Sequence, residues 1–349
     1  MRHTALSLVL LIASNVAFAG SITRVGTLAV PRDQVSATLL SDGRVLVVGG
    51  NSAERRLEVF DPRTGTSTLV NEMTELPLIG PTTTRLRDGR LLILGGGYQT
   101  DGRKSFGIYG NQASEAYDDG AAKLTAAGRM NDLRKDHVAT LLADGGVLIT
   151  GGEMVNIGGF HVWRTVHASA EIFDPATNTF RVIASMHEAR MNHTATLLRD
   201  GRVLIAGGST LEIFDPQWET FTPLESGQTR REAHSATLLT NGTVLLVTGT
   251  AVEIFDPVTN QVAPAGEIGY RGYHTATRLR NGNVLLAGGA ADAIVYDPAK
   301  HEIVEALPLP TESRVAAVLT ENGSVLVIGG TEVLRYRPSL TPRRRAVRP

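Results

Sequence analysis

Arginine and histidine recur three residues apart along this chain of 349 residues. The pattern R-x-x-H is complete in four copies, and Arg32 holds the arginine position of an earlier copy. A ring of guanidinium groups suits carboxylates or phosphates, because the donors of each group form a fork. Imidazoles at one level could bind a transition metal or donate to an anion. The four copies supply the candidate binding residues Arg134, Arg190, Arg231, Arg271, His137, His193, His234 and His274.

The elements that must position these residues are best seen in residues 189–224. HTATLL and RVLIAGG are two short strand-like runs around Asp200-Gly201, and this dipeptide predicts a type I′ hairpin turn. LEIF follows, then the turn signal Asp215-Pro216, then ETFT. Four antiparallel strands are therefore expected, and a sheet this small cannot bury its own faces.

The unit is repeated seven times along the chain. Its turn glycines are Gly43, Gly89, Gly145, Gly201, Gly242, Gly282 and Gly323, at intervals of 40 to 56 residues. Four strands per unit at this period predict a propeller, and six units contain a Gly-Gly pair where neighbouring backbones can approach closely. The fold expected is all-β, a single seven-bladed β-propeller of four-stranded antiparallel blades. The seventh unit lacks a fourth strand, so we expect residues 21–25 to supply it and close the ring.

The repeated pattern, R-x-x-H-x-A-x-x-L-x-D-G-x-V-L-x-x-G-G followed by E-[IV]-F-D-P, resembles kelch repeats of the type found in the central domain of galactose oxidase. The resemblance covers nearly all of residues 20–338. Phe180 and Phe221 stand where many kelch repeats have tryptophan, as in the bacterial style of repeat. In such repeats the histidine commonly joins one blade to the next by hydrogen bonds. The resemblance therefore favours a structural role for the histidines, and we expect no metal and no cofactor.

Tyr273-His274 is similar to the adjacent Tyr-His pair that ligates copper in galactose oxidase and glyoxal oxidase. Those enzymes also need a cysteine that is cross-linked to another tyrosine. This chain has no cysteine, which excludes that radical chemistry. Exported kelch propellers that epimerise sialic acid are a second comparison, but no residue role can be transferred from them by motif.

The binding face is expected where the R-x-x-H loops and the loops after Gly-Gly lie together. Two of these loops, in units 2 and 3, are 15 residues longer than the loop of unit 4 and contain Tyr98, Tyr109 and Trp163. Long loops on a rigid scaffold often hold binding residues, although they can also cover the channel or pack on each other. The opposite face, made of short Asp-Gly and Asp-Pro turns, is expected to be scaffold.

The ends of the chain predict an exported protein. Residues 1–19 have a basic start, a short apolar core and the small-residue exit Ala17-Phe18-Ala19, typical of a cleavable signal peptide. Residues 20–338 form the propeller, and residues 339–349 form a basic, disordered tail. We expect a secreted or periplasmic monomer with no membrane span. The body is acidic once the terminal arginines are set aside, which argues against nucleic acid as a partner.

The function favoured by these observations is a non-enzymatic binding module for an acidic carbohydrate or an exported protein. Tyr98, Tyr109, Trp163 and Tyr273 would offer flat contacts, and the arginines would hold the acidic group. The alternative is a sugar-modifying enzyme, such as an isomerase or epimerase, at the same channel mouth. Its candidate carboxylates are Glu188, Glu232 and Glu312, and a raised pKa at one of them would favour this alternative.

Overall fold

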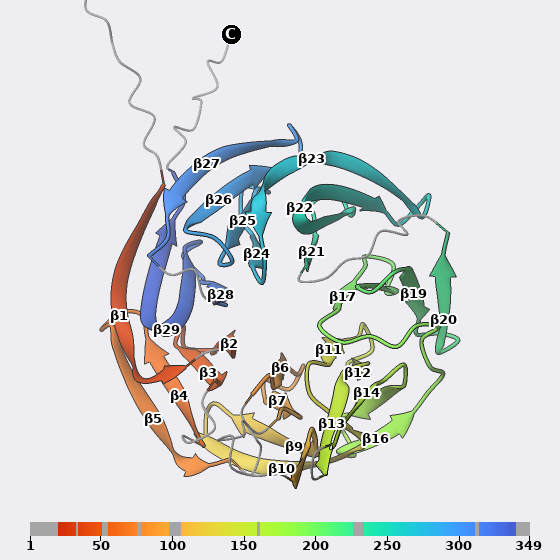
Figure 1. The fold of residues 1–349 in the computed structure, drawn as a ribbon. Coiled ribbons are helices and arrows are strands. Elements are labelled where there is room, and N and C mark those ends of the chain that lie inside the picture. The colour runs from red at the N-terminus through yellow and green to blue at the C-terminus, as the bar shows by residue number, and fades with distance from the viewer. Residues whose placement is uncertain are drawn as a thin grey trace, which may run out of the picture.

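The computed structural model describes residues 20–32, 34–50, 55–74, 79–97, 106–158, 161–225, 234–310 and 314–339. Within these ranges every regular element is a β-strand. The strands form eight antiparallel sheets, and seven of these sheets are arranged as blades around one axis (Figure 1). The expected all-β, seven-bladed propeller is thus confirmed. The described part of the chain has no helix long and apolar enough to cross a membrane.

The blades follow one another along the chain. Blade I contains β2 (Val35–Leu39), β3 (Val45–Gly49), β4 (Arg56–Asp61) and β5 (Thr66–Met73), and blade II contains β6 (Thr82–Arg85), β7 (Leu91–Leu94), β9 (Asn111–Asp118) and β10 (Lys123–Arg134). Blade III contains β11 (Val138–Leu141), β12 (Val147–Thr150), β15 (Ala170–Asp174) and β16 (Thr179–Val182), and blade IV contains β17 (Thr194–Leu197), β18 (Val203–Ala206), β19 (Leu211–Asp215) and β20 (Thr220–Leu224). Blade V contains β21 (His234–Leu238), β22 (Val244–Asp256) and β23 (Gln261–Arg271), and blade VI contains β24 (Thr275–Arg278), β25 (Val284–Ala287), β26 (Asp292–Asp297) and β27 (Glu302–Pro308). Blade VII contains β28 (Ala316–Leu319), β29 (Val325–Arg337) and β1 (Ser21–Arg32).

In blades V and VII one long run supplies both the second and the third strand. The first half of β22 pairs with β21 and its second half pairs with β23. In the same way β29 pairs first with β28 and then with β1, from Gly330↔Arg32 to Arg337↔Ser21. The N-terminal strand is therefore the outermost strand of the last blade, as expected, and it extends beyond residue 25 to Arg32.

The inner hairpin of each blade turns at the Asp-Gly or Asn-Gly pair, but the turn is not type I′. In blade I the amide of Gly43 donates to Leu40 O at 3.1 Å, and the amide of Leu40 donates to Arg44 O at 2.7 Å. Gly43 has a φ of 84°, whereas Asp42 is not among the residues with positive φ. This is a type I turn followed by a left-handed glycine, the three-residue hairpin loop. The dipeptide predicted the hairpin correctly and the turn type wrongly, because only one of its residues is left-handed.

The core lies between the blades. Second strands such as β7, β12 and β18 are buried at every residue, because each is covered on both faces. The described residues form seven hydrophobic clusters, and each spans two neighbouring blades. One of them joins Leu326 and Ile328 of blade VII to Val45 and Val47 of blade I. This contact closes the ring around the axis.

The long loops of blades II and III form a further small sheet. Strand β13 (Glu153–Gly158) pairs on one side with β14 (His161–Val166) and on the other with β8 (Phe106–Tyr109). The two loops thus pair with each other, as in the alternative in which the long loops pack together.

Candidate functional site

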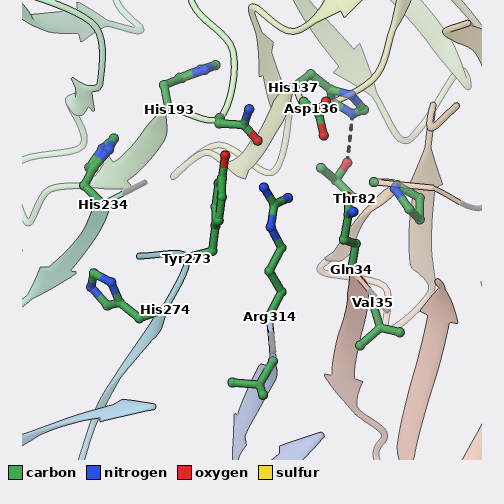
Figure 2. Close-up of a pocket in the computed structure, with 14 residues that line it drawn as sticks. Gln34, Val35, Thr82, Asp136, His137, His193, His234, Tyr273, His274 and Arg314 are labelled. Carbon is green, nitrogen blue, oxygen red and sulfur yellow. Dashed lines mark hydrogen bonds between the residues drawn. The ribbon is translucent and has the colours of Figure 1, made fainter. Parts of the chain in front are cut away.

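A cavity of about 310 Å³ lies at the central axis, at the end of the ring where the R-x-x-H loops enter the blades (Figure 2). All seven blades contribute to its wall with the first residues of their innermost strands or the residues just before them. The lining residues are Gln34, Val35, Gly80, Pro81, Thr82, Asp136, His137, Asn192, His193, His234, Tyr273, His274, Arg314 and Val315. We call this cavity the mouth.

The residue immediately before the histidine position differs from blade to blade, and we call the members of this set the mouth residues: Gln34, Gly80, Asp136, Asn192, Tyr273 and Arg314. Four of them have a positive φ, between 49° at Asn192 and 65° at Gly80. This left-handed backbone turns the chain sharply into the inner strand. The mouth therefore receives a different side chain from almost every blade.

Arg314 and Tyr273 form the central feature of the mouth. The Cζ atom of Arg314 lies 3.2 Å from the centroid of the Tyr273 ring, a close cation–π contact. Both side chains point toward the middle of the cavity in Figure 2. Among the residues that the structure describes, no carboxylate forms an ion pair with Arg314. The guanidinium is thus held in place by an aromatic face while its N–H donors stay available.

Asp136 is the acidic residue of the mouth, and it is already paired. The Lys135 Nζ atom lies 2.8 Å from Asp136 Oδ2 and 2.6 Å from Glu153 Oε1. Glu153 is 1 % exposed and also pairs with Arg164 of β14. This chain of charges ties the small sheet to the wall of the mouth and compensates the charge of Asp136.

The arginines of the motif lie beneath the mouth, inside the blades. Arg32, Arg134, Arg190 and Arg271 are each at most 2 % exposed. Arg134 donates to Glu171 Oε1 at 3.1 Å and to Ser169 Oγ at 2.8 Å. Arg134 is the last residue of β10 in blade II and Glu171 belongs to β15, the third strand of blade III, so these bonds join two neighbouring blades. The side chains do not line the mouth, so their predicted contact with a ligand has no support from their position.

The equivalent contacts recur in the other blades. Arg32 Nε donates to Glu58 Oε2 at 2.8 Å, and Arg190 Nη2 donates to Glu212 Oε1 at 2.6 Å. Arg271 Nη2 donates to Asp292 Oδ1, also at 2.6 Å. The carboxylate in each case belongs to the third strand, at or near the glutamate of the E-[IV]-F-D-P pattern. Arginine and carboxylate are thus two halves of one repeated buried ion pair.

The histidines join neighbouring blades, as the kelch resemblance implied. His137 Nε2 lies 2.9 Å from Thr82 Oγ1 of blade II, and His193 Nε2 lies 2.7 Å from Thr150 Oγ1 of blade III. His234 contacts Thr194 of blade IV at 3.0 Å, and His274 contacts Ser235 of blade V at 2.8 Å. Each imidazole therefore hydrogen-bonds the preceding blade.

The Gly-Gly pairs make room for these rings. A Cβ atom added to Gly95 would lie 2.7 Å from His137 Cε1, and one added to Gly151 would lie 2.8 Å from His193 Cε1. Both distances are shorter than any packing contact. The first glycine of one blade and the histidine of the next blade therefore form one structural unit.

Three of the histidines that wall the mouth, His137, His193 and His274, are neutral at pH 7. Burial, helped by the positive charge of the motif arginine nearby, lowers the pKa of His137 and of His193 to about 3. Burial also lowers the pKa of His274, and Arg271 acts in the same direction. The positive charge in the mouth therefore comes from Arg314 rather than from imidazolium groups.

Several predicted residues lie away from the mouth. Trp163 belongs to β14, is 55 % exposed and stacks on His161 with 5.7 Å between ring centroids. Tyr98, Arg231, Glu232 and Glu312 lie outside the described residues, and Tyr109 is described only by its backbone in β8. The structure therefore brings together the four histidines and Tyr273, and Trp163 is not among the residues that line the mouth.

Glu188, the described candidate for acid catalysis, is held ionised. Burial acts to raise its pKa, but hydrogen bonds from Ser209 and Thr210 and the charge of Arg190 outweigh it and lower the pKa. The Glu188 Oε1 atom accepts from Ser209 N at 2.9 Å. A lowered pKa is the opposite of what a general acid needs.

Three comparisons place the chain among known proteins. A family model described as the Kelch motif matches residues 142–187, which span most of blade III. No curated protein matches the sequence. A fungal alcohol oxidase of the AA5 family, solved in complex with copper, is similar in structure with a TM-score of 0.71 and 16 % identity, over 93 % of this chain and 77 % of that one. A streptogramin B lyase is similar with a TM-score of 0.66 and 11 % identity, over 92 % of this chain and 99 % of that one. At these identities the likeness concerns the fold.

The residues of this chain do not fit a copper site of the oxidase kind. His274 uses both ring nitrogens, since Nε2 contacts Ser235 and Nδ1 lies 2.8 Å from Gly272 O. The cationic Arg314 covers the ring of Tyr273. The described residues include no group of three or more histidine, aspartate or glutamate side chains placed to share a metal ion. We therefore derive no chemistry through copper.

Arg314 is the residue that the sequence analysis missed. It stands one position before Val315, in a copy of the repeat that has neither the arginine nor the histidine of the motif. A comparison of all copies at the position before histidine would have found it, because Arg314 and Tyr273 are the largest side chains in that set. Asn192 and Gln34 could have been found in the same way.

Proposed function

We propose that this chain, a seven-bladed β-propeller with a match to the Kelch motif, is a binding module whose mouth holds the acid group of a carbohydrate. The observation that carries the proposal is the Arg314 guanidinium, which stacks on Tyr273 at the centre of the mouth without a carboxylate partner among the described residues. A guanidinium matches a carboxylate with two parallel N–H···O bonds. Kelch propellers generally serve as binding modules, in agreement with this role.

The surroundings of Arg314 favour a sugar acid over a simple anion. The cavity of about 310 Å³ is at the lower end of the range for small-molecule sites, which suits one sugar unit. The amide groups of Gln34 and Asn192 and the hydroxyl of Tyr273 can each donate and accept hydrogen bonds. Asp136 adds an acceptor for sugar hydroxyls. The neutral rings of His137, His193 and His274 add polar surface to the wall without adding charge.

We propose in addition that the protein is exported and monomeric. The support is the sequence of residues 1–19 and the absence of cysteine, which leaves ring closure to strand pairing. Mass spectrometry of the protein recovered from the cytoplasmic and exported fractions tests export, and size-exclusion chromatography with light scattering tests the oligomeric state. A full-length protein confined to the cytoplasm would contradict export, and a dimer would contradict the monomer.

The binding proposal is tested by a thermal-shift panel of D-glucuronate, D-galacturonate and N-acetylneuraminate, with D-glucose and D-galactose as neutral controls. A ligand at 100 times its Kd stabilises the fold by about 2.7 kcal/mol. We expect a rise in melting temperature with at least one acidic sugar and none with the neutral ones. Calorimetric titration of that sugar then gives its affinity.

The variants compare arginines on the two faces. Arg314→Gln should abolish the shift and leave the melting temperature of the free protein unchanged. Arg314→Lys should keep part of the affinity, because it retains the charge and loses the fork. Arg63→Gln is the control, since Arg63 lies on the opposite face with its side chain 74 % exposed. Equal binding by Arg314→Gln and wild type, or no shift with any acidic sugar, would overturn the proposal.

A further inference from the structure

The face opposite the mouth has a larger hollow, of about 830 Å³, beside the Asp-Gly turn of blade III. Asp144 and Gly146 line it on the side of the turn, and Ile172 and Arg181 line it on the side of the outer strands. The repeats offer an internal standard for this place, because the same turn occurs in every blade. In three of the four blades whose turn is Asp-Gly, the residue after the turn glycine is arginine.

Arginine holds that position in blades I, II and IV, as Arg44, Arg90 and Arg202. Arg90 Nε donates to Asp88 Oδ2 at 2.7 Å, and Arg202 Nε donates to Asp200 Oδ2 at 2.8 Å. The far end of each side chain reaches the next blade.

The acceptor there is the proline carbonyl of an Asp-Pro turn. Arg90 Nη2 donates to Pro175 O at 3.1 Å, and Arg202 Nη2 donates to Pro257 O at 2.9 Å. A guanidinium bridging carboxylate and carbonyl is thus a repeated feature of this face.

Blade III has Gly146 instead and lacks the bridge. The amide of Gly146 still donates to Asp144 Oδ1 at 2.9 Å, as the arginine amides do in the other blades. Within the described residues no cation pairs with Asp144. Gly146 is not among the glycines with positive φ, so the backbone does not require glycine here. Asp144, in the wall of the hollow, is therefore left without the arginine that pairs with its counterparts in blades II and IV.

We propose that this hollow binds an arginine side chain presented by a partner protein. The incoming guanidinium would take the place of the missing one, with its donors on Asp144 Oδ2 and its methylene stem along Ile172. The chemistry required of the ligand is the chemistry that this fold already uses at Arg90 and Arg202. Arginine is favoured over lysine because the bridge needs two donors at a fixed spacing. The proposal is independent of the ligand at the mouth.

The test is an NMR titration of glycine-labelled protein with L-argininamide, followed at the amide of Gly146. L-citrulline amide, which has a neutral urea group of similar shape, is the control ligand. We expect a saturable shift at millimolar L-argininamide and none with the citrulline compound. Asp144→Asn should weaken binding several-fold, and Asp200→Asn, its counterpart in blade IV, should leave it unchanged.

Gly146→Arg is the decisive variant because it fills the hollow from within. A Cβ atom at Gly146 would lie 3.3 Å from Ile172 Cγ2, and blade IV accommodates Arg202 with an isoleucine at the equivalent place, Ile213. The variant is followed at the labelled amide of the neighbouring Gly145, which it keeps. It should fold with an unchanged or higher melting temperature and show no titration with L-argininamide. An unchanged titration in this variant or in Asp144→Asn, or no titration of the wild type, would overturn the proposal.

A second inference concerns the amino group that cleavage of the predicted signal would create, and it rests on the proposed export. Gly20, the first residue after the Ala17-Phe18-Ala19 exit, is buried, and its backbone nitrogen donates to Glu305 Oε1. The other carboxylate oxygen accepts from the Tyr336 hydroxyl at 2.8 Å. A Cβ atom at position 20 would lie 2.7 Å from Glu305 Oε2, which leaves room for glycine alone.

We infer that the mature protein begins at Gly20 and that its α-ammonium group forms an ion pair with Glu305. This pair would fasten the first residue of the closing strand β1 to blade VI. Mass spectrometry of the secreted protein should give a first residue of Gly20. Any other first residue would contradict the inference.

The ion pair is tested separately from export with protein made in the cytoplasm. Glu305→Gln should lower the melting temperature more in a chain that begins at Gly20 than in one that keeps Phe18 and Ala19 before it. Equal losses in the two chains would show that the charge of the amino group contributes nothing.

Discussion

Two sets of residues in the R-x-x-H loops are adjacent in sequence and differ in surroundings. The motif arginines and histidines are repeated from blade to blade, and nearly all that are described are buried and paired within the protein. The mouth residues, one position before the histidine, differ from blade to blade and line the cavity. Arg134 and Arg314 illustrate the contrast, since the first is bonded to Glu171 and the second, among the described residues, contacts the ring of Tyr273 without a carboxylate partner. In this propeller the residues that recur from blade to blade hold the scaffold together, and the residues that vary line the candidate site.

The sharpest test of the scaffold side is Arg134→Ala. The change leaves the fully buried Glu171 without its partner, and breaking a buried pair in this way costs about 3–5 kcal/mol. Urea unfolding should show a loss of that size. A loss below 1 kcal/mol would remove the distinction between the two sets.

The histidines make stability depend on pH. The pKa of His137 and of His193 is about 3 in the folded protein and close to 6.5 when unfolded, so the unfolded chain binds more protons between these values. Their contribution is complete above pH 6.5 and is lost as the pH falls toward 3, by about 1.4 kcal/mol per pH unit for each ring.

Unfolding measured at pH 7 and pH 5 tests this dependence. His193→Gln, which keeps a hydrogen-bonding group toward Thr150, should reduce the slope without removing the fold. A slope identical to that of the wild type would show that His193 is protonated in the folded state.

The hydrogen bond between Thr150 of blade III and His193 of blade IV predicts a smaller loss of stability. Thr150→Val removes the hydroxyl that contacts His193 Nε2 and leaves a buried ring nitrogen unsatisfied, at a cost of about 1–3 kcal/mol. A double-mutant cycle that combines Thr150→Val with His193→Gln should give a coupling energy that shows the contact between the two side chains to be stabilising. Additive losses would mean that the two side chains act independently.

The smallest loss of stability is expected for Arg181, an arginine that belongs to neither set. Arg181 makes a bidentate pair with Glu219, but the side chain of Arg181 is 58 % exposed. Exposed pairs contribute about 0–1 kcal/mol, so Arg181→Ala should change the free energy of unfolding little. A loss as large as that of Arg134→Ala would show that burial does not separate the two kinds of arginine.

The features of the fold that could be predicted from the sequence are those that recur in every repeat. The seven Asp-Gly or Asn-Gly turns and the missing last strand led to seven blades and N-terminal closure, because strand pairing is a local and periodic property. The structural role of the histidines followed from the kelch resemblance and is confirmed by the bonds to Thr82 and Thr150.

The site was harder to predict because the pattern emphasises residues that recur. Burial of Arg134 and Arg190 depends on carboxylates about 20 to 40 residues further along the chain, a long-range contact that spacing does not reveal. Arg314 and Gly146 differ from the repeat, so a search for recurring residues passes over them. The pairing of the two long loops also depends on tertiary contact.

The most direct test compares Arg314, which lines the mouth, with Arg32, which is buried beneath it. Arg314→Gln and Arg32→Gln are measured for calorimetric binding of the acidic sugar that stabilises the wild type, and for urea unfolding. The account predicts that Arg314→Gln loses binding and keeps its stability, and that Arg32→Gln loses about 3–5 kcal/mol of stability and keeps its affinity. Retained binding in Arg314→Gln together with lost binding in folded Arg32→Gln would contradict it.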